Sequence, residues 1–129
     1  MGSEMCIRDR GVAERPIYKG VMMSINIVFS SDTDVYMRDT IADNVRSSII
    51  TYINSLPMGG TIVISNIIQT AKNVSENVYD VNISALKIGD FDHINDRYLN
   101  MRSVFIANQT IRWNEKYYTS ARGIAICNA

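Results

Sequence analysis

The sequence predicts a two-layer α+β domain, in which a mixed or antiparallel sheet has one long helix and one short helix packed on one face. The chain has 129 residues, which is the size of one domain. Stretches with every second residue apolar predict strands, and stretches with apolar residues three or four positions apart predict helices. Hydrophobic residues make up 47% of the chain, enough for one core without disulfide or metal support.

The first strong pattern is a strand over residues 21–29. Apolar residues occupy every odd position there, while the even positions are mixed. A strand alternates its side chains between two faces, so the odd face should meet the core. That face consists of Val21, Met23, Ile25, Ile27 and Phe29.

A long helix is expected over residues 35–55. The preceding segment, residues 30–34, has the sequence SSDTD and offers several side chains that can cap the first turn. Residues 57–60, PMGG, should end the helix because proline cannot continue its hydrogen bonds and glycine accepts a positive φ. The expected apolar face carries Val35, Ile41, Val45, Ile49, Ile53 and Leu56.

A short strand, a short helix and a second long strand should follow. Residues 61–64 are β-branched and predict the short strand. Ser65 or Asn66 is expected to cap a helix that ends near Lys72. Residues 78–88 alternate again and predict the long strand. Its apolar face is expected to carry Tyr79, Val81, Ile83 and Ala85.

The C-terminal third gives weaker signals. Residues 89–96 are polar and predict a turn, while residues 98–106 fit either a helix or a strand and are expected to be extended near residues 103–107. Three short strands are then expected, separated by turns. They cover residues 110–113, 116–119 and 123–127.

Residues 1–10 are expected to be an artefact. The segment GSEMCIRDR matches the in-frame translation of a transposase-type sequencing adapter, and such additions carry no information about the fold. A genuine polar N-terminus is the alternative. We therefore expect residues 1–10 to be disordered, and residues 11–129 to form a single domain that is a fragment of a longer protein.

The charge balance argues against nucleic-acid binding. The 13 Lys and Arg residues equal the 13 Asp and Glu residues in number, and no basic block interrupts the mixture. Nucleic-acid binders usually show a basic patch, because phosphate neutralisation dominates their affinity. No apolar run approaches the roughly 18 residues that cross a bilayer, so no membrane contact is expected.

Metal and cofactor sites are not expected either. Cys6 and Cys127 form no CxxC motif, and His93 is the only histidine. The acidic cluster over residues 90–96 lacks the glycine and the glutamate of a calcium loop, so we expect a turn there. Cys127 lies on a strand pattern and is expected to be buried as a small hydrophobic residue.

No catalytic constellation is apparent. The chain has no GxSxG motif, and its single histidine has no matching nucleophile. Gly59 and Gly60 have no P-loop continuation and predict a turn. Arg102, Arg112 and Arg122 lie near aromatic residues, but ordinary surface pairing is the better explanation at zero net charge. We expect a protein that is not an enzyme and has no small-molecule substrate.

The order of elements and several motifs resemble a known family. Residues 52–63 read YINSLPMGGTIV between the long helix and the short strand, and residues 114–118 (NEKYY) and 123–126 (GIAI) fall at the end of the chain. This sequence resembles the C-terminal region of baseplate J-like proteins, which include the wedge subunit of myovirus baseplates. The resemblance is firm over residues 21–81 and weaker from residue 89 onward.

The resemblance implies a structural role in a bacteriophage. It implies a virion protein of the contractile tail baseplate, assembled in the host cytoplasm, whose partners are other baseplate wedge proteins and copies of itself. Apolar residues outside the expected inward faces would be the candidate subunit interface. Alternatively, they form a second core face. These candidates are Met22, Val28, Trp113, Tyr117 and Tyr118.

Two other functions remain open. A ferredoxin-like ligand-binding or regulatory module would need a closed pocket with convergent polar groups. A fragment of a small enzyme would need a histidine or a cluster of acids with shifted pKa values in a cleft. Each feature can be looked for in the three-dimensional structure.

Overall fold

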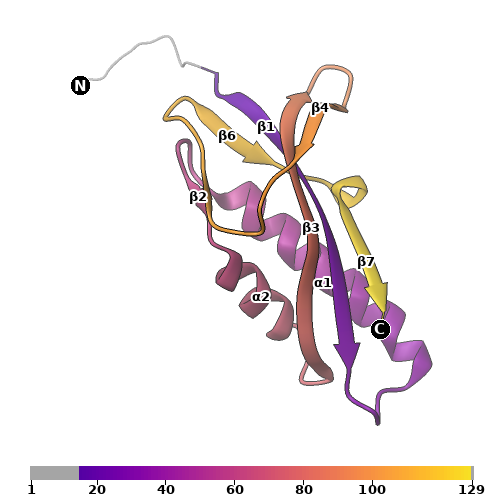
Figure 1. The fold of residues 1–129 in the computed structure, drawn as a ribbon. Coiled ribbons are helices and arrows are strands. Elements are labelled where there is room, and N and C mark those ends of the chain that lie inside the picture. The colour runs from indigo at the N-terminus through magenta and orange to yellow at the C-terminus, as the bar shows by residue number, and fades with distance from the viewer. Residues whose placement is uncertain (1–14, 129) are drawn as a thin grey trace.

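A computed structural model describes residues 15–128 and shows a mixed α+β fold with both helices on one side of a curled sheet (Figure 1). The proposed adapter segment, residues 1–10, lies outside the described residues. The elements, in chain order, are β1 (Ile17–Phe29), α1 (Val35–Ser55), β2 (Thr61–Ile62), α2 (Ile64–Lys72), β3 (Val78–Asp92), β4 (Arg97–Ser103), β5 (Gln109–Thr110), β6 (Glu115–Tyr118), the 3-10 turn η1 (Ala121–Gly123) and β7 (Ile124–Asn128).

The main sheet is mixed. Its order is β4-β3-β1-β6, and β7 pairs with β1 farther along the same edge as β6. The β1–β3 and β3–β4 pairs are antiparallel, whereas β6 and β7 run parallel to β1. The short strands β2 and β5 form a separate antiparallel pair. Strand β1 is therefore the central strand of the main sheet, with β3 on one side and β6 and β7 on the other (Figure 1).

The core lies between the sheet and the two helices. The predicted inward face of β1 is confirmed, because its five odd-numbered apolar residues from Val21 to Phe29 are all buried. The helix contributes Ile41, Val45, Ile49 and Ile53, also buried. Each fully buried aliphatic side chain stabilises the fold by about 1.5–3 kcal/mol relative to exposure.

Helix α1 has the predicted bounds. Its N-cap is Asp34, whose carboxylate accepts a hydrogen bond of 2.9 Å from the backbone N–H of Tyr36. Val35 was expected on the buried face but is 70% exposed. It is the first residue of α1 and lies more than one turn before Ile41, the first buried residue of the helix, so the core does not reach this end of α1.

Helix α2 starts earlier than predicted. Its N-cap is Val63, so Ser65 and Asn66 lie inside the first turn instead of capping it. The side chain of Asn108, far along the chain, accepts a 3.0 Å hydrogen bond from the N–H of Ile64. A distant side chain thus satisfies a donor at the helix start, which local sequence signals cannot indicate.

Strand β3 does not keep one face over its whole length. The pairing with β1 shifts register between Ser24 and Ile25 and again between Val28 and Phe29. Each bulge adds one residue and reverses the faces beyond it. Val81 and Ile83 are buried as expected, but the prediction for Tyr79 is wrong, because its side chain is 73% exposed.

The C-terminal third differs from the expectations in detail. β3 extends through Asp92, so the polar turn comprises only residues 93–96. Residues 98–106 fitted either a helix or a strand, and the structure has a strand there, β4, which begins earlier than expected. The prediction of a buried Cys127 is wrong: its thiol is exposed, because Ile124 and Ile126 take the more buried positions on the alternating strand.

Candidate functional site

The structure separates the five candidate interface residues. Trp113 is 72% exposed, while Met22, Val28 and Tyr118 are half-buried. Tyr117 lies in the core with 1% exposure, so its side chain is not on the surface of the domain. The reason is the pairing of β6 with β1, which turns Tyr117 toward the helices and its neighbour Tyr118 toward the opposite face.

Tyr118 belongs to an aromatic cluster on the face of the sheet away from the helices. Its ring lies 4.3 Å from that of Phe91, and Phe91 lies 5.3 Å from Tyr98, measured between centroids. Gly20 makes room for this cluster, since a Cβ there would come within 2.7 Å of the Tyr98 ring. The cluster is a small second core, which was the alternative explanation for Tyr118. We name Tyr18, Phe91, Tyr98 and Tyr118 the aromatic cluster.

A second apolar surface surrounds Trp113. The N–H of Ile17 donates to the carbonyl of Asn114 at 2.9 Å, and the N–H of Gly59 donates to the carbonyl of Glu115 at 2.9 Å. These two bonds bring the start of β1 and the turn after α1 to the segment that carries Trp113. The exposed apolar side chains there are Ile17, Met58 and Trp113, at 52%, 43% and 72%, and we call them the end patch.

The sequence indicated only one member of the end patch. Trp113 could be recognised as a large aromatic residue outside any regular apolar face. Ile17 and Met58 were missed because nothing in their local sequence tells where their neighbours lie. Sequence reasoning also missed Phe105, which is 90% exposed on the loop after β4. It lies in the stretch of residues 103–107 that was expected to be extended, whereas β4 ends at Ser103.

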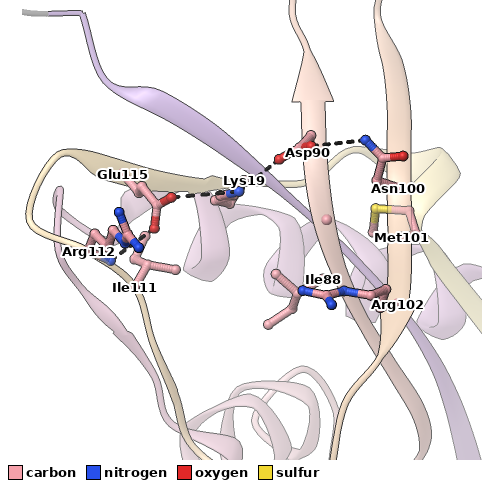
Figure 2. Close-up of a pocket in the computed structure, with 10 residues that line it drawn as sticks. Lys19, Ile88, Asp90, Asn100, Met101, Arg102, Ile111, Arg112 and Glu115 are labelled. Carbon is pink, nitrogen blue, oxygen red and sulfur yellow. Dashed lines mark hydrogen bonds and ion pairs between the residues drawn. The ribbon is translucent and has the colours of Figure 1, made fainter.

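An open groove lies on the helix-facing side of the sheet, beyond the region that the helices cover. It has a volume of about 780 Å³. Figure 2 shows its two walls, one formed by β3 and β4 and the other by residues 111–115. The sheet wall carries Ile88, Asp90, Asn100, Met101 and Arg102; the opposite wall carries Ile111, Arg112 and Glu115, with Lys19 of β1 between them.

Lys19 joins the acids of both walls. Its Nζ lies 2.7 Å from Oδ1 of Asp90 and 3.6 Å from Oε2 of Glu115 (Figure 2). The hydrogen bond from Lys19, and then the one from Asn100, lower the pKa of Asp90. The same bond to Asp90 raises the pKa of Lys19 against an opposing contribution from burial. One lysine thus bridges two carboxylates that come from opposite walls of the groove.

The two arginines of the groove differ from Lys19 in their ion pairing. Arg102 and Arg112 have exposed side chains and form no ion pair within 4.0 Å with any residue of the described range 15–128. The backbone N–H of Arg112, not its guanidinium, donates to Oε1 of Glu115 at 3.0 Å. Arg102 contributes the smallest of the effects that lower the pKa of Asp90. Surface ion pairing was expected for Arg102, Arg112 and Arg122. Within residues 15–128 it is seen for Arg122, whose Nη2 lies 3.0 Å from Oδ2 of Asp96.

The acidic cluster over residues 90–96 covers the end of β3 and the turn of residues 93–96. Asp92 accepts hydrogen bonds from the backbone N–H groups of Ile94 and Asn95, at 3.0 and 3.2 Å. The side chain of Asn95 also donates to it, and this bond is the main reason why the pKa of Asp92 is lowered. Among residues 15–128, no three His, Cys, Asp or Glu residues are grouped so that they could hold a metal ion. The predicted turn is confirmed over residues 93–96 only, and the carboxylate of Asp92 stabilises its backbone.

Comparisons with known proteins add no further assignment. No model of a known protein family matches the sequence. No curated protein sequence matches it either. Neither helix of the described range combines the length and the apolar character that a membrane-spanning helix requires.

Proposed function

We propose that this chain is a structural subunit of a contractile phage tail baseplate and acts by protein–protein assembly in the virion. The observation that carries the assembly role is the end patch, in which the start of β1 and the turn after α1 meet the segment of Trp113, with Ile17, Met58 and Trp113 exposed. The family resemblance of residues 21–81 supports the more specific assignment to a baseplate wedge. Its partners would be other wedge proteins and further copies of this chain.

The energetics of the end patch favour its burial by a partner. Covering a large apolar side chain stabilises a complex by about 1.5–3 kcal/mol, and tryptophan is among the residues that dominate binding energy in interfaces. Trp113 is 72% exposed, so most of this free energy is available for binding and is not used in folding. Phe105, at 90% exposure, adds a second apolar contact on a different loop.

The rival functions have less support. The order strand, helix, strand, helix, strand differs from the strand, helix, strand, strand, helix, strand order of a ferredoxin-like module. The described hollows are open grooves, whereas a ligand-binding module was expected to have a closed pocket. His93 lies exposed on a hairpin turn beside the ring of Tyr18, outside these grooves.

Self-association of the full chain tests the assembly role. We expect the apparent mass in sedimentation velocity to rise with protein concentration. Changing Trp113→Ser together with Met58→Ser should shift the association to at least tenfold higher concentration, since about 1.4 kcal/mol corresponds to a factor of ten. The matched control is Tyr36→Ser, an 87% exposed aromatic on the first turn of α1. A strict monomer at all concentrations, or a larger effect of Tyr36→Ser, would contradict the role of the end patch.

The genes beside this one test the baseplate assignment separately. Long-read sequencing through the locus should reveal tail-sheath, tail-tube or other baseplate genes nearby. The same reads should lack the codons for residues 2–10. Flanking genes that all encode metabolic enzymes would remove the baseplate assignment, even if the chain self-associates.

A further inference from the structure

We propose that the groove of Figure 2 binds an extended acidic segment of a neighbouring protein subunit, with Arg102 and Arg112 holding its carboxylates. This inference deepens the proposed function and rests on it, because it names the chemistry of one assembly partner. The groove adjoins the end patch, because Arg112 directly precedes Trp113, but none of the three end-patch residues lines it.

The shape of the groove favours an extended chain over a compact ligand. The hollow in Figure 2 continues into a second of about 370 Å³, with which it shares Ile88, Arg102 and Ile111. That second hollow shares the stretch around Val104 and Gln109 with a third, of about 520 Å³, which reaches Phe105. The three together form a path along β4 and the loop that follows it.

The charges of the groove favour an anionic occupant. The three basic residues of the groove outnumber its two acids, so the formal net charge of the groove is +1. Lys19 lies 2.7 Å from Asp90 and 3.6 Å from Glu115. Asn100 donates a further hydrogen bond of 3.1 Å to Asp90. Within residues 15–128 neither arginine has an ion-pair partner inside 4.0 Å, so the guanidinium groups supply the excess positive charge. An arginine binds a carboxylate through two parallel hydrogen bonds. The two arginines come from opposite walls, so a segment lying between them can reach both (Figure 2).

The apolar side chains of the groove indicate which other residues the bound segment should carry. Ile88 and Ile111 line the shared part of the path, and Val104 continues it toward Phe105. An extended segment points successive side chains in opposite directions, so acidic residues can face the arginines while apolar residues face the isoleucines. The expected occupant therefore alternates acidic and apolar residues, as a strand of a partner subunit does.

A binding assay with a defined peptide tests this proposal. The probe is a fluorescent hexapeptide that alternates glutamate with valine, and its lysine counterpart is the charge-reversed control. We expect the full chain to bind the acidic peptide, and the affinity to fall as salt is added. Arg102→Gln and Arg112→Gln should each weaken binding about tenfold, because a hydrogen bond to a charged group is worth about 1.5–3 kcal/mol. Arg97→Gln, on the same hairpin but outside the groove, should leave binding unchanged.

Three results would overturn the inference. In the first, the acidic peptide does not bind, and in the second, the lysine peptide binds equally well. In the third, inorganic phosphate or citrate competes as strongly as the unlabelled peptide, which would indicate a site for small anions. The outcome is independent of the self-association test. If Trp113→Ser abolishes association while the peptide fails to bind, only the groove inference is lost. If the peptide binds through both arginines but the chain stays monomeric, the end patch fails and the groove stands.

Discussion

Nζ of Lys19 lies 2.7 Å from Oδ1 of Asp90, where the two residues face each other across β1 and β3. The pair is partly exposed, so its contribution to stability is at most about 1 kcal/mol. Its larger effect is on the charge of the groove. With Lys19 between the two acids, Arg102 and Arg112 bring the formal net charge of the groove to +1.

Acid titration should reveal this pair. The pKa of Asp90 is lowered from 3.8 in the folded chain, so its contribution is complete above that value and is lost as the pH falls through the folded pKa. We expect Asp90→Asn to reduce the free energy of unfolding at neutral pH by less than about 1 kcal/mol. In urea denaturation at decreasing pH, the variant should lose less stability than the parent. Asp80→Asn, a more exposed carboxylate on the same strand, is the control.

Tyr117 should titrate abnormally. Burial, and then the charge of Glu115, raise its pKa to about 12 from the ordinary 10.0. Between these values the unfolded chain ionises while the folded chain does not, so stability falls as the pH rises. Tyr117→Phe should remove the highest-pH step from the ultraviolet titration of tyrosine. It also deletes the 2.9 Å hydrogen bond to the carbonyl of Gln109, at a cost of about 1 kcal/mol. An unchanged titration curve would show that Tyr117 is accessible.

The start of α1 should depend on one carboxylate. Asp34 accepts a hydrogen bond from the N–H of Tyr36, and replacing an N-cap of this type by alanine typically costs about 1 kcal/mol. We therefore expect Asp34→Ala to lower the thermal midpoint of unfolding measurably. Asp39→Ala, at an exposed position on the same helix, should change it little. Equal effects of the two changes would argue against the cap.

Gly89 should not tolerate a side chain. A Cβ at this position would lie 2.7 Å from the carbonyl oxygen of Leu99 and 2.8 Å from that of Asn100, both in the backbone of β4. Gly89→Ala should destabilise the domain by about 1–3 kcal/mol, the usual range for overpacking. Asn82→Ala, at an exposed site of the same strand, is the control for chemical denaturation. A neutral Gly89→Ala would mean that β4 packs less closely on β3 than the structure has it.

The candidate site could be predicted only in part. Trp113 was identified from its residue type, and its exposure agrees with that choice. Tyr117 and Tyr118 are adjacent in the sequence and similar in chemistry, yet one lies in the core and the other in the aromatic cluster. Only the pairing of β6 with β1 separates them. The groove was not predicted at all, because Lys19, Arg102 and Arg112 come from three separate segments.

The sequence by itself determined the α+β class, the bounds of α1 and the inward face of β1. Hydrophobic periodicity and capping act over a few neighbouring residues, so they can be recognised in the sequence. Tertiary structure alone decided the bulge that exposes Tyr79, the capping of α2 by Asn108, and the joining of Lys19 to Asp90 and Glu115. These features depend on strand register and on contacts between distant segments, where a shift of one residue moves a side chain to the opposite face.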